Sequence, residues 1–315
     1  HDAQSGSAAA DLESMLFSVI IPTFNRLELL KAALQSIRDQ SFSDRELIVV
    51  DDGSSDGTAE YVASLGGLVK CVRQDNAGPA SARNAGARLA VGEFLVFLDS
   101  DDELLPGALA AYANVIAQLP RPAIIIGAWL ETDGPVLVPP VDDRALTFTA
   151  FSDYFEAASR SRHFQSGSGV VRRDIFLAYG GFDEQLRCAE DQDLALRLGE
   201  QPTCVVVECP EQVRYRRHSA SLTANVRDVI AGARAVVSRE VARMYPGGEA
   251  RQADRRQAIL RLAVPVSIAA IAADRRIAWQ LYRRLARWAV RAGRWKYVCG
   301  FPVLAFRAAM TNARG

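Results

Sequence analysis

The 315-residue sequence contains five cysteines but no CxxC pair, which excludes a zinc ribbon and argues against a disulfide scaffold. An odd number of scattered cysteines is typical of a protein in the reducing cytosol. Internal repeats and low-complexity segments are also missing, while hydrophobic residues make up 49% of the chain and charged residues 23%. This composition indicates a folded globular protein with one large domain or two of ordinary size.

Long hydrophobic runs are absent as well. The longest candidate, Leu262–Ala273, has 12 residues, whereas a membrane-spanning helix needs about 20. No apolar stretch follows the first residues, so we expect no signal peptide. We expect residues 1–14 to be an artificial remnant, with Met15 as the native start. These features predict a cytoplasmic protein, with a peripheral position on the inner face of the membrane as an option.

The formal net charge is zero, but the charge is divided unevenly along the chain. Residues 225–315 carry 18 basic and 5 acidic side chains, and residues 1–224 carry 19 basic and 32 acidic ones. The C-terminal part is therefore at +13 and the rest at −13. This division suggests different partners: metal cations for the acidic part, and anionic lipid or another acidic surface for the basic part.

Short apolar runs alternate with amphipathic stretches over the first 120 residues. Strands are predicted at 17–22, 46–52, 68–74 and 92–102, and helices at 27–40, 57–65, 80–90 and 106–119. This alternation predicts an α/β fold with a Rossmann-like, mostly parallel sheet flanked by helices. Ligands of such sheets bind at the carboxyl ends of the strands.

The pattern is weaker in the second part of the chain. Strands are predicted at 123–129, 166–173 and 203–208, a helix at 190–200, and a loop at 131–147. From residue 225 onward the pattern is helical and basic, with breaks expected at 246–248, Pro265 and Pro302.

The acidic run Asp99-Ser100-Asp101-Asp102 follows the apolar strand EFLVFL. Three carboxylates this close repel one another unless a cation neutralises them. Mg²⁺ and Mn²⁺ prefer such oxygen ligands. The alternative is an Asp-rich turn that caps the next helix.

Two further acidic clusters and one histidine also permit either a functional or a structural interpretation. Asp51 and Asp52 end another strand, where they could accept hydrogen bonds from a nucleotide or form an Asx turn. In Glu190-Asp191-Gln192-Asp193, an acid could act as a general base or merely favour the helix N-terminus. His218 could be a metal ligand or a structural histidine.

The ordered set of blocks resembles the family 2 glycosyltransferases, the inverting enzymes with the GT-A fold. The blocks are FSVIIPTFNR, ELIVVDDGSSDGT, NAGPASARNAGARLAVGEFLVFLDSDD, GGFDE, EDQD and YRRHSASLT, and they cover residues 16–222. The resemblance implies a GT-A domain at 15–224, with a nucleotide-binding half at 15–120 and an acceptor-binding half at 121–224. Residues 225–315 lie outside it and are expected to form a basic helical extension.

The resemblance also implies roles for residues that bind the nucleotide-sugar. Pro22, Thr23 and Phe24 would line the base pocket, and Asn25 and Arg26 would extend the same loop. Asp52 would accept from the uracil N3–H, with Asp51 beside it, and Arg83 would lie near the base and diphosphate. Uracil is the family's commonest base, which implies a UDP-sugar donor.

The implied catalytic residues lie in the other acidic runs. Asp99 and Ser100 would bind the nucleotide-sugar, while Asp101 and His218 would hold Mn²⁺ or Mg²⁺, with Asp102 as an additional acid. Asp191 matches the base that deprotonates an acceptor hydroxyl, with Glu190 and Asp193 as the other candidates. The QxxRW motif of processive synthases is absent, which argues for the transfer of one sugar at a time to a glycan or lipid-linked acceptor.

Three other interpretations explain the sequence less well. FLDSDD also resembles a phosphatase of the haloacid dehalogenase class, but the Gly-Thr-like continuation of that class is absent. A nucleotidyltransferase would need a Gly/Arg/Lys-rich loop where PTFNRLELL stands. A non-catalytic sugar-nucleotide-binding module would not need the intact acids.

The basic extension has three alternative partners, and we expect no nucleic acid among them. Within 277–297, one helical face is predicted to carry Ile277, Leu281, Leu285, Trp288 and Val290, and most arginines lie elsewhere. This apolar face could pack on the catalytic domain, form a homodimer, or lie in an anionic membrane surface.

Overall fold

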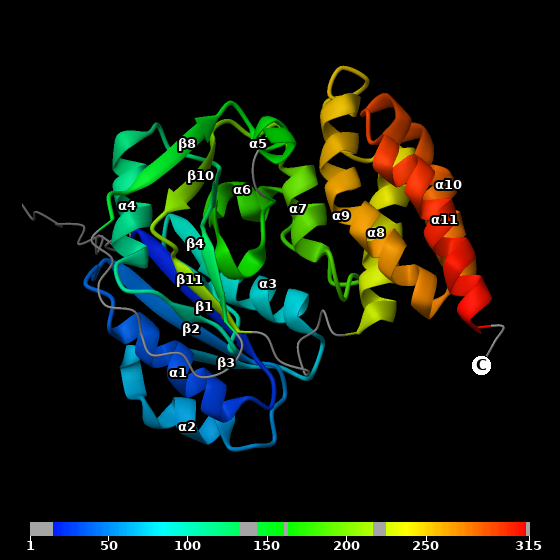
Figure 1. Cartoon of the computed structure of the whole chain (residues 1–315). Helices are drawn as coiled ribbons and strands as arrows, with labels where there is room; N and C mark the ends of the chain where they lie inside the picture. Colours follow the sequence, from blue (N-terminus) through cyan, green and yellow to red (C-terminus); the bar gives the residue numbers. More distant parts are fainter. Residues whose placement is uncertain (1–14, 133–143, 161–162, 217–224, 313–315) are drawn as a thin grey trace, which may run out of the picture.

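The computed structural model describes residues 15–132, 144–160, 163–216 and 225–312 of the chain. A twisted central sheet is flanked by helices, and four C-terminal helices stand together at one side of it (Figure 1). His218, for which we expect a metal-binding role, lies outside the described residues.

The first part of the sheet is parallel, as predicted. Its order is β3-β2-β1-β4, formed by β1 (Phe17–Thr23), β2 (Arg45–Asp51), β3 (Lys70–Arg73) and β4 (Phe94–Phe97). The intervening helices are α1 (Leu27–Arg38), α2 (Thr58–Ser64) and α3 (Pro79–Leu89), with a short 3-10 turn η1 (Gly66–Leu68). Successive β1 side chains enter opposite cores, because side chains alternate along a strand: Ile20 joins the core on the α3 side, and Val19 the core on the α1 side.

The second part of the sheet mixes directions. β9 (Gly169–Arg172) runs antiparallel between β4 and β6 (Ile124–Ile126), then β10 (Cys204–Cys209) runs parallel to β6, and β8 (Thr147–Phe151) closes the edge. A small separate sheet has the order β5 (Glu103–Leu104), β11 (Val213–Arg216) and β7 (Trp129–Thr132). The remaining elements of this part are α4 (Ala108–Gln118), α5 (Tyr154–Arg160), η2 (Ser166–Ser168), α6 (Arg173–Ala178) and α7 (Glu190–Arg197).

Some predicted elements in this second part are wrong in detail. The stretch expected to be a loop at 131–147 includes the last two residues of β7 and the first of β8. The strand expected at 166–173 begins with the 3-10 turn η2 instead. Both β7 and β8 are largely exposed, so they lack the apolar run that reveals a buried strand in a sequence.

The C-terminal helices pack on the rest of the chain. They are α8 (Val226–Val241), α9 (Gln252–Ala273), α10 (Arg275–Arg291) and α11 (Trp295–Asn312). Helix α9 contacts α5 and α8 contacts α7, while α9 and α10 form a long contact with each other. One hydrophobic core runs from the sheet into these helices, so packing on the sheet part, one of the three alternatives for the extension, is observed.

Two expectations about this helical part are wrong. Pro265 lies inside α9 and Pro302 inside α11, so neither residue breaks its helix. A proline removes one backbone hydrogen bond, and tertiary packing of the neighbouring apolar residues supports each helix through that loss. Because Pro265 does not interrupt it, α9 is long and apolar enough to span a membrane by length and composition alone, with 39% of its apolar window buried.

The predicted apolar face of α10 is largely correct. Leu281, Leu285 and Trp288 are buried, and Ile277 is partly buried. Val290 was expected on this face but is exposed, because it lies off the buried row by about half a turn. All five cysteines are free, in agreement with the absence of a disulfide scaffold.

A buried ion pair gives the first prediction, for the variant Glu240→Ala. Glu240 on α8 accepts from Arg255 Nε at 2.8 Å and from Arg256 Nε at 3.2 Å, and both Glu240 and Arg255 are buried. Removal of the carboxylate leaves a buried guanidinium without its counter-charge, which costs about 3–5 kcal/mol. Urea unfolding should show this loss of stability.

The matched control is Glu249→Ala. Glu249 also pairs with an arginine, Arg243, at 3.2 Å, but both side chains are exposed. An exposed pair contributes about 0–1 kcal/mol, so this variant should unfold nearly as the parent does. Equal losses for the two variants would contradict the buried-pair argument.

Candidate functional site

The carboxyl ends of the parallel strands meet at one edge of the sheet, where acidic residues gather. The loop after β1 contains residues 24–26, the loop after β2 begins at Asp52, and the turn after β4 contains Asp99–Asp102. Parallel strands bring these loops to the same edge of the sheet, as the sequence analysis expects. Pro22 and Thr23 are buried in the end of β1, whereas Phe24 is 43% exposed.

The loop after β1 is fixed to its neighbours. Asn25 adopts a left-handed backbone conformation with φ 51°, which asparagine tolerates better than most residues. Its N–H donates to Ser54 Oγ at 3.0 Å, and its Oδ1 accepts from the Ser55 N–H at 2.8 Å. Arg26 Nη1 then reaches Asp101 Oδ2 at 2.6 Å. The loop therefore joins the end of β2 to the acidic turn after β4.

Asp52 anchors the loop that leads into α3. Its Oδ1 accepts from Gln74 Nε2 at 2.7 Å and from the Ala77 N–H at 2.9 Å, and its Oδ2 accepts from the Gly78 N–H at 2.8 Å. Asp51 is buried and accepts from the Ser54 N–H at 2.9 Å. Beside this loop lies an open pocket of about 590 Å³, lined by Gly53, Arg73, Gln74, Asp75 and Asn76.

Arg83 connects the two halves of the site. It projects from α3, is 2% exposed, and donates from Nη2 to Asp99 Oδ1 at 2.5 Å and from Nη1 to Glu190 Oε1 at 2.9 Å. The charges of Asp99 and Glu190 raise its pKa despite burial, which by itself lowers it. A permanently charged guanidinium thus links the acidic turn after β4 to the start of α7.

The acidic turn after β4 offers a set of ligands for a hard cation. Oxygen atoms of Asp99, Asp101 and Asp102 lie within 4.8 Å of one another. Burial and the charges of Asp99 and Asp101 raise the pKa of Asp102 well above its ordinary value. A Cβ at Gly167 would stand 3.3 Å from Asp102 Oδ2, so the absence of a side chain there leaves room beside the oxygens. This donor set fits Mg²⁺ or Mn²⁺.

Asp191 has the properties of a carboxylate that exchanges protons near neutral pH. It lies in the first turn of α7 and accepts from the Gln192 N–H at 2.7 Å. Burial, followed by the charge of Glu190, raises its pKa to about 7, although Arg83 and backbone N–H groups act against this shift. A base with a pKa near the working pH is well suited to proton abstraction.

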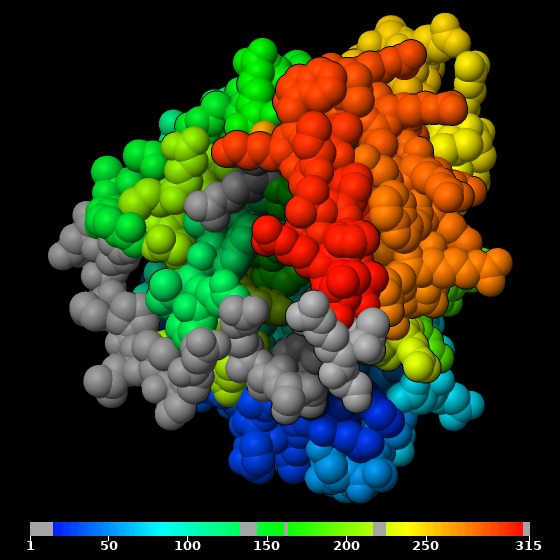
Figure 2. All heavy atoms as spheres, turned by 45° about the vertical axis from the view of Figure 1, so that its right-hand side comes forward, coloured from blue at the N-terminus to red at the C-terminus, as the bar shows by residue number. Residues whose placement is uncertain are grey.

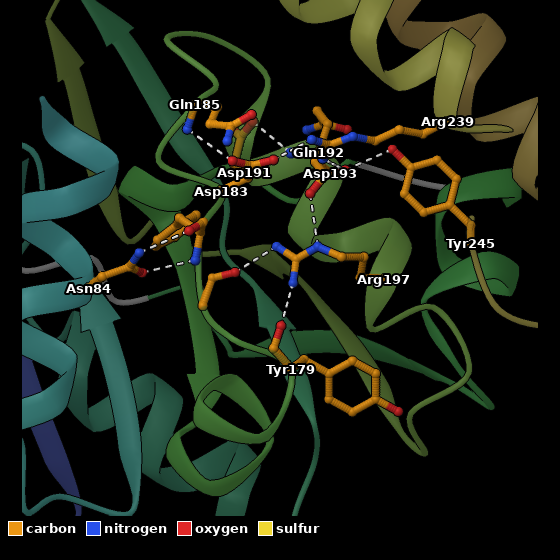
Figure 3. Close-up of polar contacts among 12 residues, drawn as sticks. Asn84, Tyr179, Asp183, Gln185, Asp191, Gln192, Asp193, Arg197, Arg239 and Tyr245 are labelled. Atoms are coloured by element: carbon orange, nitrogen blue, oxygen red, sulfur yellow. Dashed lines mark hydrogen bonds and ion pairs between the residues drawn. The ribbon is translucent and has the colours of Figure 1, made fainter. Parts of the chain in front are cut away.

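The other two acids of this turn are engaged in ion pairs. Glu190 is buried and pairs with Arg83. Asp193 is fully buried and accepts from Arg197 Nε at 2.8 Å and Tyr245 Oη at 2.8 Å, and it pairs with Arg239 Nη1 at 2.5 Å (Figure 3). Three donors therefore occupy the oxygens of this buried carboxylate, which gives Asp193 the contacts of a structural acceptor. Among the three candidate acids, Asp191 alone has no ion pair in the described part of the chain.

The Asp193 contacts reveal residues that the sequence analysis missed. Arg239 belongs to α8, and Tyr245 lies in the connection to α9, so both come from the C-terminal extension (Figure 3). Arg239 also pairs with Asp183, in the segment before α7. Helix α7 stands between the sheet and α8 (Figure 1), so the extension holds the helix that carries Asp191. Nothing in the pattern around Tyr245 indicates this contact, because its partner is 52 residues away.

Comparison with protein families gives a match over just over half of the chain. The model described as "Glycosyl transferase family 2" matches residues 18–180. A GalNAc(5)-diNAcBac-PP-undecaprenol beta-1,3-glucosyltransferase of Campylobacter jejuni is 49% identical over 98 residues, which are 30% of this chain and 32% of that protein. An uncharacterized glycosyltransferase of Haemophilus influenzae is 27% identical over 205 residues, which are 64% of this chain and 67% of that protein.

Solved structures share the fold over nearly the whole chain. TarS residues 1–349 of S. aureus, in complex with UDP-GlcNAc, superpose with a TM-score of 0.67 at 17% identity and cover 94% of this chain and 92% of that one. The mannosyltransferase PcManGT of Pyrobaculum calidifontis, in complex with GDP-Man and Mn²⁺, has a TM-score of 0.52 at 20% identity. The match covers 93% of this chain and 86% of that one. The predicted GT-A-like sheet with a helical C-terminal region is thereby confirmed.

The Asp193 network gives a prediction for Tyr245→Phe. Loss of the hydroxyl removes one of three donors to a buried carboxylate, and a hydrogen bond to a charged group contributes about 1.5–3 kcal/mol. Chemical denaturation should show a loss in this range. The control is Tyr179→Phe, whose hydroxyl accepts from Gln201 Nε2 at an exposed position, and whose stability should change little. Similar losses in both variants would contradict the special role of the Tyr245 contact.

Proposed function

Since this chain belongs to glycosyl transferase family 2, and is therefore a glycosyltransferase, we propose that it is an inverting, metal-dependent enzyme. It moves a single sugar from a UDP-sugar to a hydroxyl of a glycan or lipid-linked acceptor. The observation that carries this proposal is the Arg83 bridge, which joins the acidic turn at Asp99 to the turn of α7 that bears Asp191. Family membership leaves the phosphatase, nucleotidyltransferase and non-catalytic interpretations without support.

The donor nucleotide would lie along the ends of β1, β2 and β4. The exposed ring of Phe24 and the open pocket beside Asn76 offer a place for the base, and Asp51 and Asp52 stand at the end of β2 between them. Because Asp52 accepts from Gln74 and two backbone N–H groups, it would also fix the loop that borders the base. A UDP-sugar is supported by TarS, which binds UDP-GlcNAc on the same fold.

The cation would be held by Asp101, with Asp99 and Asp102 next to it and His218 as the further ligand expected from the sequence. When bound, Mn²⁺ or Mg²⁺ offsets the negative charge that grows on the departing diphosphate. Arg26 and Arg83 now pair with Asp101 and Asp99, so these two arginines keep the turn in place and add positive charge beside it. Ser100 is buried within the turn, where it supports its shape.

Asp191 would act as the general base. Its carboxylate accepts the proton of the acceptor hydroxyl while the hydroxyl oxygen bonds to the anomeric carbon of the donor sugar. The bond from that carbon to the diphosphate breaks on the opposite side, so an α-linked donor yields a β-linked product. Glu190 and Asp193 are less suited to this role because their oxygens are already engaged, in Glu190 by the ion pair with Arg83 and in Asp193 by contacts with Arg239 and Tyr245.

A lipid-linked acceptor is supported by the chemistry beside the base. The Campylobacter relative is named for an undecaprenol diphosphate acceptor. In this chain, burial and the positive charges of Arg261 and Arg294 lower the pKa of His163 to about 4. His163 precedes Phe164, whose carbonyl accepts from Nε2 of Gln192, the neighbour of Asp191 on α7. Gly167 of η2 lies beside Asp102. The positive charges of Arg261 and Arg294 near His163 would attract the phosphates of such an acceptor. A lipid-linked acceptor in turn suits a cytoplasmic enzyme at the inner face of the membrane.

Asp191→Asn should bind the donor but transfer no sugar. The amide keeps the size of the side chain but cannot take up the proton, so we expect a fall in turnover of about 10²–10⁴-fold. Calorimetry should find UDP-sugar affinity near that of the parent. The control is Asp44→Asn, an exposed acid remote from this turn, which should remain active. Parent-like transfer by Asp191→Asn would exclude Asp191 as the base.

The raised pKa of Asp191 predicts opposite pH effects on activity and stability. Transfer requires the carboxylate, so turnover should rise with pH up to about 7 and then level off. A carboxyl whose pKa is higher in the folded state than in the unfolded state contributes stability at low pH and loses it as pH rises to about 7. Asp191→Asn should therefore raise the melting temperature more at pH 8 than at pH 5, both pH values being about one to two units from that pKa.

A thermal-shift experiment with Asp101→Ala tests cation binding, and the same experiment identifies the nucleotide of the donor. The parent's melting temperature should rise on addition of Mn²⁺ with UDP, because ligands that bind only the folded state stabilise it. Asp101→Ala should lose this rise, whereas Asp44→Ala should keep it. The same thermal-shift measurement with GDP or dTDP in place of UDP identifies the nucleotide. A full Mn²⁺ response in folded Asp101→Ala would contradict the metal assignment.

A further inference from the structure

We propose that the outward face of α11 docks the enzyme on an anionic lipid surface. This face carries an apolar row, the α11 stripe, formed by Trp295, Cys299, Val303, Phe306 and Met310. This docking would determine where in the cell the enzyme is held, and the residues that support it lie on the surface of the C-terminal helices, away from the proposed catalytic residues. Its test needs neither donor nor acceptor, so it can fail while the proposed function stands.

The spacing of the α11 stripe places its members on one side of the helix. They follow one another at intervals of three or four residues, which at about 100° per residue keeps them on a single face. All five are exposed: Trp295 by 58%, Phe306 by 67%, Val303 by 52% and Met310 by 46%. An unbroken exposed row of this kind marks an interaction surface, whereas single exposed apolar residues do not.

Packing inside the bundle does not account for this row. Tyr297, Phe301 and Ala305 are buried on the other side of α11 and supply its core contacts. The Phe301 ring stacks on Tyr282 with ring centroids 4.5 Å apart and meets Trp279 edge-on. Helix α11 is therefore apolar on two sides, and only one of them is used within the described part of the chain.

The charges around the α11 stripe select an anionic partner. Residues 275–315 contain no Asp or Glu, whereas Arg and Lys recur throughout α10 and α11. Lys296 borders the stripe on α11, and Arg283, Arg287 and Arg291 are exposed on α10. No ion pair of these four side chains is found in the described residues. A basic residue near an anionic membrane contributes about 1 kcal/mol of attraction, and buried apolar side chains add to it.

A second copy of the chain fits this surface less well. A twofold contact between two α11 stripes would place the same basic side chains opposite each other. The region from 225 onward is at +13, so such a contact would bring like charges together. Anionic headgroups would instead neutralise the rim while the apolar row enters the edge of the acyl region.

Docking through α11 would also orient the active site. Arg261 on α9 donates to the Ser159 carbonyl at 2.7 Å, which ties the helices to the end of α5, close in sequence to η2. Figure 2 shows α11, in red, beside a hollow whose inner wall is formed by green segments of the sheet part. A lipid surface in contact with the α11 stripe would therefore lie near this opening.

The test is co-sedimentation of the full chain with vesicles of phosphatidylcholine alone or mixed equally with phosphatidylglycerol. The parent should bind the mixed vesicles at low salt, bind the neutral ones weakly, and dissociate at high salt. Phe306→Glu should lower the partition coefficient at least about tenfold, since it replaces an inserted ring by a charge. The matched control is Leu68→Glu in η1, where a side chain that is 77% exposed receives the same change.

Each other outcome would overturn the proposal. Failure of the parent to bind the mixed vesicles would do so, as would equal binding by Phe306→Glu and the parent. Light scattering without lipid tests the alternative that a second copy of the chain binds the α11 stripe. If the parent is a dimer and Phe306→Glu is a monomer, the stripe is a dimer interface and the proposal is wrong. Because Phe306 is exposed, the far-ultraviolet circular dichroism of the variant should match that of the parent, which separates loss of docking from loss of folding.

Discussion

A single buried guanidinium joins the two halves of the candidate site. Arg83 is almost fully removed from water, so its charge requires carboxylates on both sides, and these come from Asp99 after β4 and Glu190 at the start of α7. The acidic turn and α7 cannot move apart without leaving that charge unpaired. The same bridge engages Glu190, whereas Asp191, one residue further on, has no ion pair with any residue that the structure describes.

The C-terminal helices complete this arrangement from the other side. Asp193 binds Arg239 and Tyr245, so α7 is held by Arg83 at its start and by the extension one turn later. One surface of the extension thus supports α7, and another presents the α11 stripe with its basic rim. A bundle with both properties would couple the position of α7, and with it the proposed base Asp191, to a lipid surface without any rearrangement of the fold.

The sequence was sufficient to predict those parts of the fold that depend on local apolar pattern and on strand direction. The β-α alternation of the first half predicted its parallel strands and helices, because apolar periodicity differs between the two. Acids directly after β2 and β4 were expected at one edge, because parallel strands end together. The pattern was insufficient for β7 and β8, whose side chains are mostly exposed, and for Pro265, whose local tendency to break a helix is outweighed by packing.

The sequence by itself determined the family, the sheet and the set of acids available for chemistry. The family resemblance favoured Asp191 over Glu190 and Asp193 as the base, but the residues themselves gave no physical reason for this choice, because all three equally suit the first turn of a helix. Only the tertiary structure shows their different contacts, since Arg83 lies 107 residues before Glu190 and Tyr245 lies 52 residues after Asp193. Likewise, apolar residues on both sides of α11 can be read from the chain, but which side is buried depends on where α9 and α10 pack.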